Sequence, residues 1–226
     1  MRLAFAALLM LVAATLPARA AAVALVLAID VSGSVSADRY TLQREGIAHA
    51  FEMPQLVDTI ASLPGGIEAL VLEWSDPDQI TITVGWTHIA NRESAAAFAA
   101  AVRATSRTSS GLTAIGAAML AAAAAFDHMP EPAKHRVIDI SGDGAANFGE
   151  PPAHARDLLV SRGITINGLA ILTEEPHLDD YYRHNVIGGP SSFVLVAENM
   201  ASFGDAILHK LVQEVAALPF RESVVP

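Results

Sequence analysis

Cysteine is absent from this chain of 226 residues, and its absence excludes disulfide bonds, thiolate metal sites and a cysteine nucleophile. Basic residues are scarce: 14 Lys and Arg stand against 24 Asp and Glu, so the formal charge is −10 at pH 7. Such an acidic chain repels a phosphate backbone, which excludes non-specific nucleic-acid binding. Without disulfides the fold must be held by an apolar core, and a hydrophobic content of 52% allows one.

The first 20 residues have the layout of a secretory signal peptide. Arg2 precedes an apolar run over residues 3–16, and Ala18-Arg19-Ala20 forms a small-x-small cleavage motif. We therefore expect cleavage after Ala20 and a periplasmic or secreted bacterial protein. The run is shorter than the roughly 20 residues that a membrane span needs, although an uncleaved anchor is the alternative reading.

Residues 21–218 are expected to form one domain with no further membrane span, and residues 219–226 a loose tail. Strand patterns cover residues 22–29, 67–74, 79–86, 135–140, 164–172 and 192–197, and helix patterns cover 37–51, 92–103, 112–126, 151–162 and 200–218. This alternation predicts an α/β fold with a doubly wound, mostly parallel sheet and helices on both faces. Segment 79–86 alternates polar and apolar residues, which predicts one antiparallel edge strand.

Capping and breaking residues predict where helices begin and end. Ser36 is placed to cap the first helix, and Pro54 is expected to mark its end. Asn91 is placed to cap the second helix, whose apolar face is expected to include Ala96 and Phe98.

Three polar clusters fall at the carboxyl ends of predicted strands or at the helix start beside them. In doubly wound sheets, ligands bind at this edge. The clusters supply two carboxylates and three hydroxyls, a set of oxygen ligands that suits Mg²⁺ or Mn²⁺ better than Zn²⁺. The candidate ligands are Asp30, Ser32, Ser34, Thr113 and Asp143.

These clusters resemble the metal-ion-dependent adhesion site of von Willebrand factor type A domains, whose motif is Asp-x-Ser-x-Ser followed by a later Thr and a later Asp. The matching segments are Asp30-Val31-Ser32-Gly33-Ser34, Thr113 and Ser141-Gly142-Asp143-Gly144. The resemblance covers residues 22–217 and is greatest to small exported bacterial proteins built of one such domain. One departure is Gly142, where many members have Thr, so a possible supporting hydroxyl is missing.

The resemblance implies that Ser32, Ser34 and Thr113 contact the metal directly, and that Asp30 and Asp143 bind it directly or through water. Carboxylates that act through water leave the ion a strong Lewis acid, so an Asp or Glu of a protein partner becomes a good further ligand. The implied function is metal-dependent protein binding rather than catalysis.

Two alternatives use the same fold differently. A metal-dependent hydrolase would use the ion as a Lewis acid, but no general base is placed beside the candidate ligands. A scaffold with an empty site would show no stabilisation by metal. Ser32 stands where a haloacid-type phosphatase needs a second Asp, and the chain lacks both Gly-x-Ser-x-Gly and Gly-x-Gly-x-x-Gly.

Two further features are weighed as candidate sites. The eight histidines are scattered without a His-Glu-x-x-His pattern, so we expect surface or structural roles. The acidic segment 173–190, with a short helix around 179–185, is either a solvated loop or a partner-selecting surface that uses Tyr181, Tyr182 and Arg183.

Overall fold

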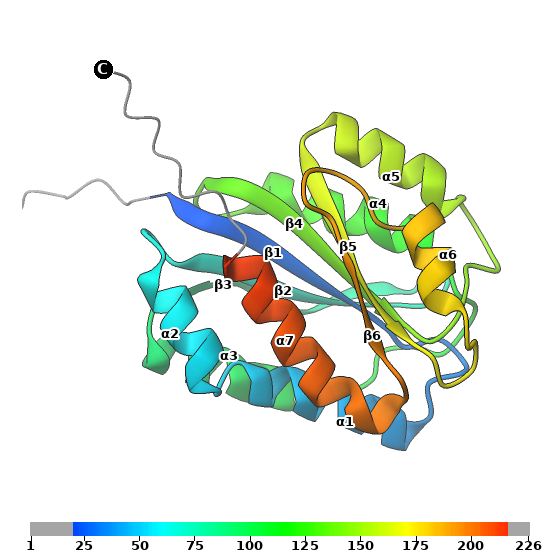
Figure 1. Ribbon diagram of the computed structural model, residues 1–226, viewed down its shortest axis with the longest axis horizontal. Helices are drawn as coiled ribbons and strands as arrows, with labels where there is room; N and C mark the ends of the chain where they lie inside the picture. Colours follow the sequence, from blue (N-terminus) through cyan, green and yellow to red (C-terminus); the bar gives the residue numbers. More distant parts are fainter. Residues whose placement is uncertain (1–19, 217–226) are drawn as a thin grey trace, which may run out of the picture.

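A computed structural model describes residues 20–216 as a six-stranded sheet between two layers of helices (Figure 1). The expected signal peptide, up to residue 19, and the expected tail over 219–226 lie outside the described residues. The strands are β1 (Ala21–Asp30), β2 (Ile67–Trp74), β3 (Ile80–Ile89), β4 (Ala133–Gly142), β5 (Ile164–Ile171) and β6 (Val194–Ala197). The α-helices are α1 (Ala37–Ala50), α2 (Pro54–Ser62), α3 (Arg92–Arg103), α4 (Ile115–Ala125), α5 (Pro152–Ser161), α6 (Leu178–Asn185) and α7 (Phe203–Ala216). Two short 3₁₀ turns are η1 (Phe126–His128) and η2 (Met200–Ser202).

The strand order is β3-β2-β1-β4-β5-β6, with only the edge pair β2–β3 antiparallel. The predicted doubly wound sheet with one antiparallel edge strand is therefore confirmed. The chain leaves β1 toward β2 and β3 on one side and later returns to β4, β5 and β6 on the other. The direction of winding reverses between β1 and β4, so a crevice is expected where their carboxyl ends diverge.

The core has two layers because side chains alternate along the strands. Leu25 and Leu27 of β1 face the layer of α1, α2, α3 and α7, whereas Ala24 and Val26 face the layer of α4, α5 and α6 (Figure 1). β1 is buried along all ten residues because both its faces and both its edges are covered. On the face covered by α4, α5 and α6, the alanine side chains of β1 and of the alanine-rich α4 allow this helix to approach the sheet closely.

Three expectations about helices are wrong in detail. Pro54 does not simply end the first helix but begins α2, since a helix start needs no amide hydrogen at its first position. Ala96 is exposed, whereas Ala95 is buried beside Phe98, because residues three apart lie on the same face of a helix. α3 otherwise has the predicted bounds and the predicted Asn91 cap.

The third error concerns the start of α4, which was expected at residue 112. The helix begins at Ile115, because the preceding backbone is bonded to neighbouring loops instead. The Thr113 amide donates to Asn147 Oδ1 (2.9 Å), and the Ala114 amide donates to the Ser75 carbonyl (3.0 Å). Thr113 therefore lies just before the helix rather than in its first turn.

None of the helices within residues 20–216 has the length and apolar character needed to cross a bilayer.

Candidate metal centre

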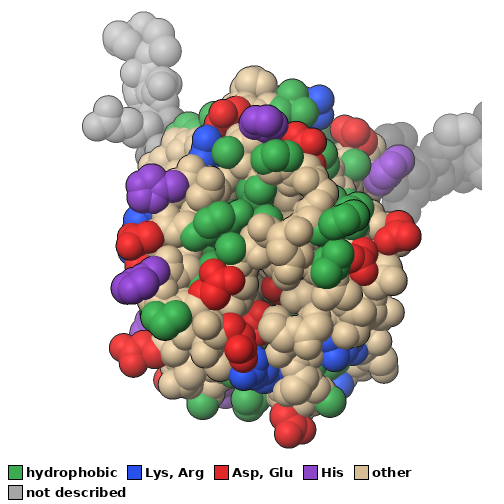
Figure 2. All heavy atoms as spheres, turned by 90° about the vertical axis from the view of Figure 1, so that its right-hand side faces the viewer, with side chains coloured by type: hydrophobic (Ala, Val, Ile, Leu, Met, Phe, Trp, Pro, Cys, Tyr) green, Lys and Arg blue, Asp and Glu red, His purple; other side chains and the backbone are tan. Residues whose placement is uncertain are grey.

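The carboxyl ends of the parallel strands form one face of the molecule, which is turned toward the viewer in Figure 2. That face is hollowed near its centre, and acidic and apolar side chains surround the hollow (Figure 2). β1 and β4 end here, and each delivers one predicted carboxylate, Asp30 and Asp143.

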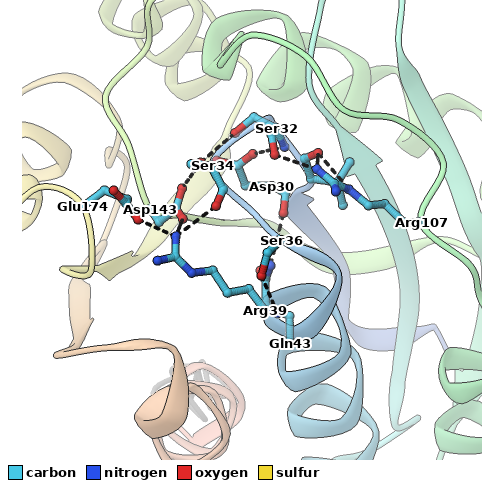
Figure 3. A network of polar contacts seen from close by, with 10 residues as sticks. Asp30, Ser32, Ser34, Ser36, Arg39, Gln43, Arg107, Asp143 and Glu174 are labelled. Atoms are coloured by element: carbon cyan, nitrogen blue, oxygen red, sulfur yellow. Dashed lines mark hydrogen bonds and ion pairs between the residues drawn. The ribbon is translucent and has the colours of Figure 1, made fainter.

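The turn after β1 gathers the first three candidate ligands (Figure 3). Asp30 Oδ1 accepts a hydrogen bond from the Ser32 amide at 2.7 Å, which folds the chain back on itself as Asp side chains commonly do in turns. The hydroxyl oxygens of Ser32 and Ser34 are then 3.3 Å apart. The Gly33 amide donates to the Gly111 carbonyl at 2.8 Å, so the segment before Thr113 lies against this turn.

Asp143 joins this group from the end of β4. Ser34 Oγ donates to Asp143 Oδ1 at 2.5 Å, a contact between residues 109 positions apart in the sequence. Asp30, Ser32, Ser34 and Asp143 therefore form one continuous chain of polar contacts at the point where the winding of the sheet reverses (Figure 3).

Thr113 is held between the two loops by its backbone. Its amide donates to Asn147 Oδ1, and its carbonyl accepts from the Asn147 amide at 3.1 Å, four residues beyond Asp143. Its side chain is buried, and its hydroxyl makes no hydrogen bond with any residue of the described range 20–216. The structure thus places all five predicted residues at one edge of the sheet, with direct polar contacts joining four of them.

Both carboxylates are removed from water, which favours a compensating positive charge. Burial raises the pKa of Asp30 to about 7, against the opposing effect of its hydrogen bonds with Ser32. Burial also raises the pKa of Asp143, while the Ser34 hydrogen bond and the charge of Arg39 act in the opposite direction. Asp30 Oδ2 is buried and accepts no hydrogen bond from the described residues. A buried acceptor without a donor is costly, and a bound cation relieves that cost.

Two arginines that the sequence reasoning did not single out flank the site. Arg39 Nη1 donates to the Ser34 carbonyl at 2.9 Å and lies 3.5 Å from Asp143 Oδ2, and it also pairs with Glu174 (Figure 3). Arg107 Nη2 donates to the carbonyls of Val31 and Ser32 at 2.7 and 2.8 Å. The sequence carries one signal for Arg107, a lone basic residue in the polar loop that leads to Thr113.

The donor set fits a hard divalent cation. Across residues 20–216, no three His, Cys, Asp or Glu side chains gather into a group that could hold a metal ion by themselves. The candidate ligands are instead two carboxylates and three hydroxyls, and hard oxygen ligands suit Mg²⁺ or Mn²⁺.

Exposed apolar side chains lie beside the candidate ligands. Leu112, next to Thr113, is 45% exposed, and Phe148, next to Asn147, is 53% exposed. Phe148 also lines a shallow groove of about 500 Å³ with Pro151 and Tyr181. We call Leu112 and Phe148 the apolar rim.

Of the two alternatives for segment 173–190, the partner-selecting surface of Tyr181, Tyr182 and Arg183 is wrong for Tyr182. Its side chain is completely buried in the core between α6 and the sheet. Tyr181 is half-buried and its hydroxyl accepts from the Ala146 amide, whereas Arg183 is exposed and pairs with acidic residues of its own helix. Periodicity within a short polar segment could not indicate which tyrosine points inward.

Comparison with solved structures gives the class of the fold, that of von Willebrand factor type A domains. A domain described as von Willebrand factor type A from Catenulispora acidiphila has a TM-score of 0.61 at 18% identity, covering 87% of this chain and 43% of that one. Proximal thread matrix protein 1 from the mussel byssus, with a zinc-occupied MIDAS motif, has a TM-score of 0.60 at 18% identity, covering 88% and 49%. The pilus adhesin SpaC from Lactobacillus rhamnosus GG has a TM-score of 0.61 at 14% identity, covering 86% and 30%.

The chain thus spans about half or less of the length of each of these proteins. It belongs to the family described as "Protein of unknown function (DUF1194)", whose model matches residues 20–219. A search of curated proteins finds no match.

Proposed function

We propose that this domain holds a protein partner through one Mg²⁺ or Mn²⁺ ion at the five candidate ligands. Ser32, Ser34 and Thr113 would contact the ion directly, and Asp30 and Asp143 would bind it directly or through water. The ion supplies a positive, Lewis-acidic centre for an Asp or Glu carboxylate of the partner. The observation that carries this proposal is the chain of contacts from Asp30 to Asp143, which leaves the buried Asp30 Oδ2 without a donor.

The surroundings support a partner of mixed character. The apolar rim offers contact area for side chains that flank the partner carboxylate, and exposed aromatic residues are favoured at interfaces. Glu150 and Glu174 are 45% and 47% exposed near the same face, so Lys or Arg beside the partner carboxylate would complement them. The acidic chain and its signal-like first 20 residues favour an exported protein in the periplasm or outside the cell.

The hydrolase alternative gains no support from the site. Glu174 is the carboxylate that shares Arg39 with Asp143, so its side chain is engaged in an ion pair. The adhesion-type structural neighbours favour binding over catalysis.

Thermal unfolding of the protein lacking residues 1–20 tests the proposal. Melting is measured with Mg²⁺, with Mn²⁺ and with a chelator, for the wild type, Asp30→Ala and a matched control, Asp38→Ala, whose exposed side chain lies in the first turn of α1. Metal at 100 times its dissociation constant stabilises a protein by about 2.7 kcal/mol, which corresponds to a melting shift of roughly 5–10 °C in a domain of this size.

We expect the shift in the wild type and in Asp38→Ala, and its loss in Asp30→Ala. No shift in the wild type at millimolar metal, or an equal shift in Asp30→Ala, would rule the proposal out. Partner capture in Mg²⁺ should then be reversed by the chelator, and Phe148→Ala should weaken capture while leaving the metal-induced melting shift unchanged.

A further inference from the structure

Tyr182 of α6 places a second orphan polar atom beside Asp30. Its hydroxyl is buried and, like Asp30 Oδ2, makes no hydrogen bond with the described residues. A Cβ atom built on Gly142 would lie 2.8 Å from Tyr182 Oη and 2.9 Å from Asp30 Oδ2. The hydroxyl and the carboxylate oxygen therefore border the same small space, which the missing side chain of Gly142 leaves open.

The position of the Tyr182 ring is fixed by two glycines. Its Cδ1 atom would lie 2.6 Å from a Cβ on Gly168 of β5, and its hydroxyl lies over Gly142 of β4. Any larger residue at either position would push the ring away from the end of β1. The glycines thus let one side chain reach from α6, across β5 and β4, to the carboxylate of β1.

The hydroxyl is not needed for packing. Leu178 of α6 and Val186, the residue directly after α6, belong to the same buried cluster as Tyr182 and are purely apolar. A phenylalanine would fill the same volume, whereas a buried hydroxyl without a partner destabilises the folded protein. Burial and the nearby carboxylates raise the pKa of Tyr182 well above its ordinary value, so the hydroxyl keeps its proton and remains a donor.

We propose that Tyr182 is a positioning residue of the candidate metal centre: a small shift of its ring brings the hydroxyl, unbonded in this structure, into a hydrogen bond with Asp30 Oδ2. That bond holds the carboxylate in the orientation that binds the cation, and the second lone pair of the oxygen stays available to the ion. This inference rests on the proposed function for its metal readout. It also explains the departure at Gly142: the phenol of Tyr182 enters the space that a threonine side chain would fill, and supplies a hydroxyl from a different element.

Metal affinity gives the first test. Isothermal titration with MgCl₂ compares the wild type with Tyr182→Phe and with Tyr181→Phe, the matched control whose hydroxyl accepts from the Ala146 amide. Loss of one hydrogen bond to a charged group should weaken Mg²⁺ binding about ten-fold in Tyr182→Phe. Tyr181→Phe should bind Mg²⁺ as the wild type does. Equal affinity of wild type and Tyr182→Phe would overturn the inference.

A double-mutant cycle without metal gives the second test. The free energy of unfolding is measured in urea for Tyr182→Phe, Asp30→Asn and the double variant, all in the presence of a chelator. Contact between the two groups predicts effects that do not add, whereas additive effects would overturn the inference. If the effects do not add but the wild type binds no Mg²⁺, the contact stands and the proposed metal function fails. If the effects add while Mg²⁺ binds normally to every tyrosine variant, the proposed function stands and the inference about Tyr182 fails.

Discussion

Arg39 brings a fixed positive charge next to a carboxylate that is proposed to bind a cation. Its Nη1 atom lies 3.5 Å from Asp143 Oδ2, and its side chain is only 26% exposed. The charge of Arg39 lowers the negative potential that a metal ion would experience at this point. The residue would therefore lower the affinity for the proposed ion, and it offsets part of the negative charge of the acidic pair in the metal-free protein.

Replacing Arg39 by Gln should strengthen Mg²⁺ binding. Removal of one partly exposed ion pair changes the electrostatic free energy by about 1 kcal/mol, so the dissociation constant should fall about five-fold. Isothermal titration measures the change, with Arg92→Gln as the control because Arg92 is exposed at the start of α3. Unchanged or weaker binding in Arg39→Gln would contradict this electrostatic account.

Gly116 of α4 sets the distance between that helix and the loop that follows Asp143. A Cβ atom at this position would lie 2.1 Å from the Glu150 carbonyl oxygen. Gly116→Ala should therefore destabilise the protein by about 2 kcal/mol through overpacking, although alanine ordinarily favours a helix by about 1 kcal/mol.

Urea unfolding of Gly116→Ala beside Gly85→Ala separates these two effects. A Cβ on Gly85 of β3 would meet no atom within 4 Å, so that variant should retain the stability of the wild type or gain a little. A stabilised Gly116→Ala would mean that the loop yields easily and does not hold Thr113 in place.

At the scale of elements, α7 is anchored to the sheet by a buried group of charges. Lys210 Nζ forms ion pairs of 2.6 Å with both Asp139 of β4 and Glu214 of its own helix, and Asn167 of β5 donates to Glu214 at 2.8 Å. Burial and the nearby Glu214 raise the pKa of Asp139, and Lys210 acts in the opposite direction. One lysine cannot fully compensate the negative charges of two carboxylates. Asp139 therefore keeps its proton at pH values above the ordinary pKa of an aspartate.

This raised pKa has a definite sign for stability. As the pH rises from about 4 toward neutrality, the unfolded chain has already released the Asp139 proton while the folded protein retains it. The contribution of Asp139 to the free energy of unfolding must then fall with rising pH. Between pH 5 and pH 7, the free energy of unfolding should fall less in Asp139→Asn than in the wild type. Urea unfolding at the two pH values measures this difference. The surface variant Asp38→Asn serves as control, and an unchanged slope in Asp139→Asn would contradict the account.

Local patterns in the sequence predicted elements well where one segment carries the whole signal. The helix that Asn91 caps and that ends at Arg103 was predictable, because the cap is a local signal. The buried strand Ile67–Trp74 was predictable because one apolar run defines it. The fold class and the closeness of Asp30 to Asp143 could also be predicted from the sequence. The order of strands and helices determines which strand ends lie side by side.

Features that depend on packing between distant elements could not be predicted in the same way. From the sequence alone, Lys210 is expected at an exposed position of a helix. Its burial follows only from the packing of α7 against Asp139. From the sequence alone, Tyr182 belongs to a polar segment. Its burial depends on the space that Gly142 and Gly168 leave for its ring. A proline is compatible both with the end of one helix and with the start of the next. The sequence alone therefore does not distinguish these two roles for Pro54, which begins α2.

For the whole molecule, the candidate ligands lie on three segments that are far apart in the chain and meet at one face. A bound ion would therefore link the turn after β1, the segment before α4 and the loop after β4, so its effect on motion should be concentrated there. Hydrogen exchange with and without Mg²⁺ measures this directly.

We expect Mg²⁺ to slow exchange in residues 31–36, 107–114 and 143–147, and to leave residues 163–167 at the opposite edge of the sheet nearly unchanged. The effect should vanish in Asp30→Ala. Equal slowing at both edges would indicate a general stabilisation rather than a site that joins these three segments.

The central place of β1 has a mechanical consequence. The strand begins at Ala21 on the edge opposite the candidate site and ends at Asp30 within it, and both its neighbours, β2 and β4, run parallel to it (Figure 1). Tension between a captured partner and the amino end of β1 would run along the strand. It would load both hydrogen-bonded ladders in shear, so that many bonds must break together instead of one at a time. In a single-molecule pulling experiment along this axis, we expect the partner to detach before β1 leaves the sheet.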